Sequence, residues 1–101
     1  MLTWHRVRGA QRVSCTKACA DAGLVCAPAA FAALNSCAWL RAAFPCEAGC
    51  ASGSGPELPA YNSGAVADAS TLCRTEGDKA APRTCDAAVA NTRRLCPCGK
   101  T

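Results

Sequence analysis

Ten of the 101 residues are cysteine, and their spacing constrains the fold more than any other feature of the sequence. Cys15 and Cys19 stand four apart in a segment that reads as helix, and Cys96 and Cys98 stand two apart in an extended segment. Residues i and i+4 share a helix face, and residues i and i+2 share a strand face. Both pairs span about 6 Å, so they can close as parallel rungs. Such rungs would tie the start of the domain to its end.

Large apolar side chains are scarce, which makes covalent cross-links necessary. The chain has two Phe, two Trp, one Tyr and one Met among many alanines. Apolar burial stabilises by roughly 25 cal/mol per Å², and a small core rarely offsets chain entropy alone. Disulfides add about 2–4 kcal/mol each. Because the cysteine count is even, we expect five disulfides and an oxidising compartment: the secretory pathway, the extracellular space or an organelle lumen.

Capping residues predict several short helices within one domain. Ser14 and Gly23 bracket a helix over 15–22, and Pro28 precedes another over 29–34. Further helices are expected at 37–44 and, after Asp86, at 87–91, with a short strand or turn at 24–26, a surface loop at 74–84 and an extended stretch at 93–99. The sequence therefore predicts a small disulfide-rich fold, mainly α with irregular loops and at most a short sheet. Its expected parts are a basic N-terminal arm (1–13), a disulfide-stapled domain (14–99) and a tail (100–101).

The positive charges favour a protein partner over a nucleic acid. The net charge is +4, with a basic N-terminal segment and an Arg93–Arg94 pair that we expect on a solvated surface. A nucleic-acid protein shows a denser run of Lys and Arg. Arginine and aromatic residues favour interface cores, and we expect Trp39 and Phe44 in the domain's own core. The candidate partner-binding residues are Trp4, Arg6, Arg8, Arg12 and Tyr61.

Four stretches, in order, carry a family resemblance. Ser14-Cys15-x3-Cys19, Gly23-Leu24-Val25-Cys26, Phe31 with Leu34-Asn35, and Arg94-Leu95-Cys96-Pro97-Cys98 resemble the cysteine-rich C-terminal region of Golgi glycosyltransferases of family 18, the N-acetylglucosaminyltransferase V type. The chain is also similar to modules of algal secreted or surface proteins. The resemblance implies nested bridges Cys15–Cys96, Cys19–Cys98 and Cys26–Cys85. It implies Cys37–Cys73 less directly and leaves Cys46–Cys50 as the remainder.

Other uses of the cysteines fit the sequence less well. Cys15-x3-Cys19 and Cys96-Pro97-Cys98 supply four sulfurs for zinc, but His5 is the only histidine and the even total suits bridges. A redox dithiol has two residues between its cysteines, whereas this pair has one. Plant lipid-transfer proteins carry adjacent cysteines, which this chain lacks. The uncharged stretch 22–40 has membrane-spanning length, but Gly, Pro and polar residues interrupt it.

The residue types needed for catalysis are sparse. The single histidine lies in the basic arm, and the seven carboxylates are spread singly. We therefore expect no enzyme activity, cofactor or metal in this chain, and no membrane-spanning segment. No apolar segment of a signal peptide follows Met1, so we expect a fragment or a processed form. The expected function is a non-catalytic lumenal or extracellular module that binds protein or serves as a structural subunit of a larger assembly. The alternative is the C-terminal appendage of a Golgi glycosyltransferase.

Overall fold

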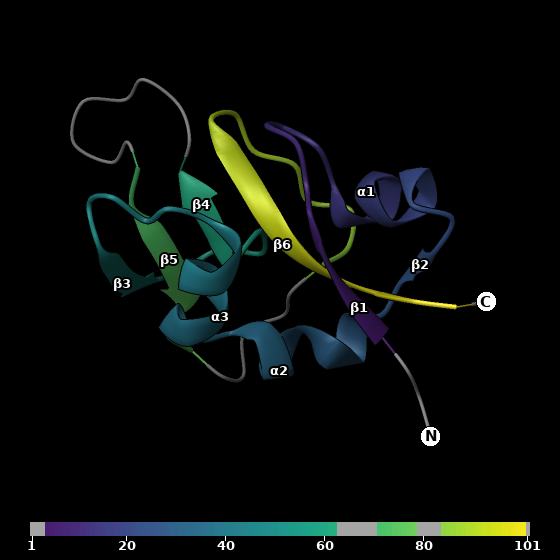
Figure 1. The fold of residues 1–101 in the computed structure, drawn as a ribbon, viewed down its shortest axis with the longest axis horizontal. Coiled ribbons are helices and arrows are strands. Elements are labelled where there is room, and N and C mark those ends of the chain that lie inside the picture. Colours follow the sequence, from purple (N-terminus) through teal and green to yellow (C-terminus); the bar gives the residue numbers. More distant parts are fainter. Residues whose placement is uncertain (1–3, 63–70, 79–83, 101) are drawn as a thin grey trace.

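The computed structural model describes residues 4–62, 71–78 and 84–100, in which short helices pack against a mixed sheet (Figure 1). The sheet order is β1-β6-β4-β5-β3, and β2 also pairs with β6. β3 runs parallel to β5, and every other pair is antiparallel. The described elements are β1 (Trp4–Arg8), α1 (Cys15–Asp21), β2 (Val25–Cys26), η1 (Pro28–Ala30), α2 (Phe31–Leu34), α3 (Cys37–Ala43), β3 (Cys50–Gly53), β4 (Ala60–Asn62), β5 (Cys73–Glu76) and β6 (Thr92–Gly99).

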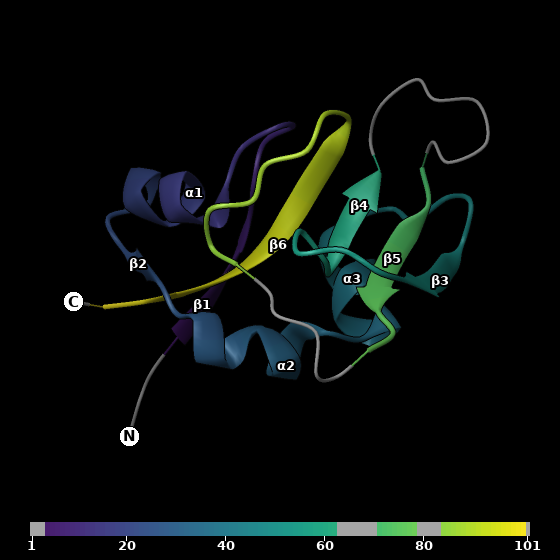
Figure 2. The same cartoon turned by 180° about the vertical axis from the view of Figure 1, so that it is seen from behind.

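Strand β6 connects the two parts of the sheet, because it pairs with β1 and β2 and also with β4 (Figure 2). Its first residues pair with β4, and the residues from Leu95 to Gly99 pair with β1. Side chains alternate across a strand, so Cys96 and Cys98 share one face and Leu95 lies on the other. Helix α1 packs against β6 on the cysteine face, where its own cysteines are buried.

The helix signals of Ser14, Gly23 and Pro28 are confirmed. The Ser14 hydroxyl accepts a hydrogen bond from the Lys17 backbone N–H at 3.1 Å, which caps α1. Gly23 follows with a φ of +76°, a conformation that glycine adopts without strain. Pro28 occupies the start of η1, and Ser36 caps α3 through the Trp39 backbone N–H at 3.2 Å.

The prediction of a mainly α fold is wrong. Among the described residues no helix exceeds seven residues, whereas six strands form one sheet. Alanine favours helix locally, but sheet partners lie far apart in the sequence and leave no local pattern. The strand β1 lies within the stretch assigned to a separate arm, residues 74–76 belong to β5, and no helix forms at 87–91. No described helix is both long and apolar enough to cross a membrane.

Five disulfides are present, as expected, and three join the cysteines that the resemblance implies. These are Cys15–Cys96, Cys19–Cys98 and Cys26–Cys85. The other two expected pairs are wrong: the structure has Cys37–Cys50 and Cys46–Cys73.

The reason for this exchange of partners is the backbone between Cys46 and Cys50. The two residues do not share a helix face, because the segment is a turn in which Cys46 and Gly49 have φ values of +45° and +106°. The turn leaves Cys46 in the core beside Cys73. Cys50 begins β3, where it is half-buried and bonded to the first residue of α3.

The buried side chains form two clusters, one on each side of β6. One holds Phe31 and the Cys15–Cys96 and Cys19–Cys98 bridges. The other holds apolar residues of α2, α3, β4, β5 and β6, including Phe44, Tyr61 and Leu95. The burial of Phe44 is as expected.

Arg94 is fully buried, although the sequence placed it on a solvated surface. Its Nε donates to the Glu57 carbonyl at 2.9 Å, and its terminal nitrogens donate to the Ala87 and Pro56 carbonyls at 2.8 and 3.2 Å. Burial lowers the pKa of Arg94 to about 10, with the charges of Glu57 and Asp86 opposing the shift. The guanidinium therefore stays charged at neutral pH and ties two loops to β6.

Candidate protein-binding site

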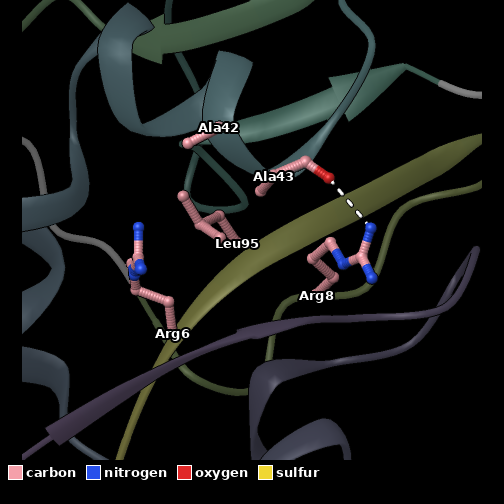
Figure 3. Close-up of a pocket in the computed structure, with 5 residues that line it drawn as sticks. All are labelled: Arg6, Arg8, Ala42, Ala43 and Leu95. Atoms are coloured by element: carbon pink, nitrogen blue, oxygen red, sulfur yellow. Dashed lines mark hydrogen bonds between the residues drawn. The ribbon is translucent and has the colours of Figure 1, made fainter.

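A groove of about 360 Å³ lies between β1 and α3, with one arginine at each side (Figure 3). Arg6 and Arg8 are two apart on β1 and therefore share a face. In the ladder they stand opposite Pro97 and Leu95, and the Leu95 side chain forms the floor. Ala42 and Ala43 of α3 form the opposite wall. The groove thus has a positively charged rim over an apolar floor. Leu95 in that floor is itself fully buried, so the accessible apolar surface comes from Ala42 and Ala43.

Helix α3 fixes both arginine side chains. A terminal nitrogen of Arg8 donates a hydrogen bond to the Ala43 carbonyl at 3.2 Å, at the negative end of the helix (Figure 3). The Arg6 guanidinium carbon lies 4.2 Å from the centre of the Trp39 ring, a cation–π contact. Both arginines remain solvent-exposed.

Arg93 of β6 connects the same face to the core. Its Nε donates to the Gly9 carbonyl at 3.0 Å, and its guanidinium carbon lies 5.4 Å from the centre of the Phe44 ring. Phe44 stacks on Tyr61 with ring centres 5.2 Å apart. The aromatic stack gives this side of the molecule a rigid backing.

Beyond the stack, the Tyr61 hydroxyl donates to the Glu47 carboxylate at 2.6 Å. This hydrogen bond lowers the pKa of Glu47, and the same bond is the largest cause of the raised pKa of Tyr61. The pair therefore links the turn after α3 to β4.

The charge of the groove is not neutralised within the described part of the chain. The ion pair found there joins Lys17 and Asp21 on α1, with nitrogen and oxygen 3.2 Å apart. No carboxylate in the described ranges forms an ion pair with Arg6 or Arg8. An acidic ligand would therefore find two cations at fixed positions.

The structure brings together two of the five predicted partner-binding residues. Arg6 and Arg8 border the groove. Arg12 lies beyond β1, exposed, with its backbone N–H bonded to the Thr92 carbonyl at 3.0 Å. Trp4 begins β1 opposite Gly99. Tyr61 is only 6% exposed, and its ring belongs to the core.

Trp39 was expected in the core, and this expectation is wrong. The side chain is 38% exposed beneath Arg6. The sequence carried a usable signal: Leu40 and Phe44 are four apart and both large and apolar, so the residue before Leu40 points about 100° away from the face they share.

The cysteines supply no thiolate for metal or redox chemistry, because all ten are joined in disulfides. Within residues 4–62, 71–78 and 84–100, no group of three or more His, Cys, Asp or Glu is arranged to hold a metal ion. The surface described above offers charge and apolar area rather than a reactive group.

The fold and cross-links define a disulfide-stapled domain of mixed α and β structure with a basic groove. The model of the family described as Glycosyltransferase family 18 matches residues 2–98, and the chain therefore belongs to this family. A search of curated proteins finds no match. Five disulfides in a member of a Golgi-type family indicate an oxidising compartment of the secretory pathway.

Proposed function

We propose that this chain is a non-catalytic lumenal or extracellular module that binds an acidic segment of a protein partner at the groove between β1 and α3. One observation carries the proposal: Arg6 and Arg8 flank an apolar floor without an ion-pair partner in the described residues. Arginine forms bidentate hydrogen bonds to carboxylates. The exposed Trp39 beside Arg6 adds apolar area of the kind that anchors interfaces.

The fixed backbone around the groove supports this function. The Cys37–Cys50 bridge holds the start of α3, and the Cys15–Cys96 bridge holds β6 next to the groove floor. A preformed site loses less entropy on binding than a flexible one. The module therefore suits docking by a partner without rearrangement of its own core.

The test is calorimetric titration of the oxidised chain with a glutamate-rich peptide. We expect saturable binding that weakens with added salt and is lost in the double variant Arg6→Glu/Arg8→Glu. Arg41→Glu is the control, because it makes the charge change of each single substitution at an exposed position that does not line the groove. Undiminished binding by the double variant would overturn the proposal.

A second candidate is favoured by the family match: the chain is the C-terminal appendage of a Golgi glycosyltransferase. In that case the groove receives an acidic segment of the catalytic domain of the same polypeptide. The test compares sugar transfer by a fused catalytic domain with and without this module, and by the module alone. Transfer by the module alone would refute the non-catalytic assignment.

A further inference from the structure

We infer that the partner adds an extended strand to the outer edge of β1, with acidic side chains alternating with small apolar ones. This inference rests on the proposed function and specifies the shape and sequence pattern of the segment that binds: its backbone lies outside β1, and its acidic side chains reach Arg6 and Arg8 at the rim of the groove. Three observations carry it: the free backbone of β1, the different character of the two hollows beside the strand, and the charge of the edge.

The outer backbone of β1 is available for pairing. β1 is the terminal strand of the sheet and pairs only with β6 among the described strands. The Gly9 N–H donates to the Arg94 carbonyl at 2.8 Å, which sets the phase of the antiparallel ladder. Along an antiparallel ladder, every second residue forms its backbone hydrogen bonds to the partner strand, and the peptide groups of the residues between them point the other way. The peptide groups of Arg6 and Arg8 therefore point away from β6.

The two faces of β1 offer different surroundings to an added strand. On one face lies the arginine groove. On the other lies a second hollow of about 320 Å³, which continues past β1 to α1 and whose lining includes Val7, Val13 and three alanines. Arg8 and Asp21 also border this hollow, and Asp21 would repel an acidic side chain there. Because side chains of a strand alternate between faces, one row would be acidic and the other small and apolar.

The positive charge along the outer edge of β1 disfavours pairing with the β1 strand of a second copy of this chain. Pairing two β1 strands would bring the Arg6 and Arg8 rows of both molecules together, and facing like charges destabilise a strand pair. Basic residues on an edge strand commonly prevent such self-association. An acidic strand instead meets opposite charges while its backbone satisfies the exposed peptide groups of β1.

The experiment uses short peptides in which glutamate alternates with alanine or valine, titrated against the whole oxidised chain. N-methylation at every second residue removes the N–H groups that would face β1, and N-methylation at the other residues leaves them intact. We expect the first series to bind at least about tenfold more weakly than the second. Arg8→Glu should weaken the unmodified peptide by about tenfold, and Arg41→Glu should not.

The outcomes separate this inference from the proposed function. Equal effects of both methylation series, with binding still dependent on Arg6 and Arg8, would overturn strand addition and leave an acidic partner in the groove. Absence of any arginine-dependent binding of acidic peptides would overturn the proposed function as well. Equal binding by peptides with the same composition in a non-alternating order would also overturn the inference.

Discussion

At the scale of single residues, two neighbouring arginines differ in burial. Arg93 and Arg94 read as one basic pair in the sequence, yet Arg94 is fully buried and Arg93 only half-buried. Alternation along β6 places the two side chains on opposite faces: Arg94 lies with the bridged Cys96 and Cys98, and Arg93 lies with Leu95. Because Arg94, Cys96 and Cys98 are spaced two apart, the sequence could have predicted that their side chains lie on the same face of the strand. The carbonyl groups that satisfy it come from loops, which no local pattern reveals.

Arg94→Met should lower the free energy of unfolding by about 3 kcal/mol, because it leaves buried carbonyl groups without their donors. Arg93→Met is the matched control and should cost about 1 kcal/mol, since its hydrogen bond and ring contact are half-exposed. Urea denaturation of the oxidised proteins measures both values. Equal losses would contradict the role given to the buried guanidinium.

The hydrogen bond between Tyr61 and Glu47 gives stability a pH dependence. Glu47 has a lowered pKa, so its contribution is present above the usual value of 4.5 and is lost as the pH falls through the lowered value. Tyr61 has a raised pKa, so its contribution is present below the usual value of 10.0 and is lost as the pH rises through the raised value.

Tyr61→Phe keeps the ring that stacks on Phe44 but removes the donor. We expect the pKa of Glu47 to rise towards its usual value, measured by carboxyl NMR titration. The stability difference between the two proteins should be largest between the two usual pKa values, and it should disappear below the lowered pKa of Glu47 and above the raised pKa of Tyr61. An unchanged Glu47 titration would refute the pairing.

At the scale of elements, the helix ends marked by Ser14, Gly23 and Pro28 were predictable, whereas the strand partners were not, and the helix expected after Asp86 does not form. Ser14, Gly23 and Pro28 act within a few residues of their own position, so the sequence reveals them directly. Strand β6 instead pairs with a segment about ninety residues away, and the β3–β5 pair depends on register across a long connection. Such pairings are fixed by tertiary packing, which also redirected Cys46 and Cys50.

One contact between elements replaces a missing stretch of sheet. The Asn35 side chain after α2 receives a hydrogen bond from the Glu76 backbone N–H at 2.7 Å and donates to its carbonyl at 2.9 Å. It therefore satisfies the end of β5 as a neighbouring strand would.

Asn35→Ala should lower the free energy of unfolding by about 2 kcal/mol, because two backbone groups lose their partners. Asn35→Asp keeps the acceptor but loses the donor, so we expect it also to be destabilised near neutral pH. Chemical denaturation tests both, with Ser54→Ala in an exposed loop as the control. Wild-type stability of the Asn35→Ala variant would contradict the role given to these two hydrogen bonds.

At the scale of the whole molecule, the Cys15–Cys96 and Cys19–Cys98 bridges act as a pair. They close loops with sequence separations of 81 and 79, and both tie α1 to β6. Either bridge alone keeps the chain ends together, so removal of one releases only the small ring between the rungs. Removal of both also opens the larger ring between the rungs and the Cys26–Cys85 bridge, which stays closed. The same-face argument from the cysteine spacing anticipated this arrangement, whereas nothing in the spacing fixed the middle pairs.

Paired serine substitutions test this cooperation. Loss of one rung should cost about 2–3 kcal/mol, and loss of both should exceed the sum of the single costs by about 1 kcal/mol, because the Cys26–Cys85 bridge still limits the released loop. Unfolding midpoints of the two single-bridge variants and of the combined variant give the comparison. The Cys37–Cys50 bridge is the control, because it lies apart from the rungs and its loss should add independently. If the free-energy costs of losing the two bridges simply add, the two bridges do not act as a pair.

The pairing of Trp4 with Gly99 has a consequence for protein engineering and evolution (Figure 1). Antiparallel partners lie only about 5 Å apart, so a host polypeptide could enter and leave this unit almost at one point. The whole module could be spliced into a surface turn of another protein, or its ends joined and new ones opened elsewhere, with little distortion of either structure.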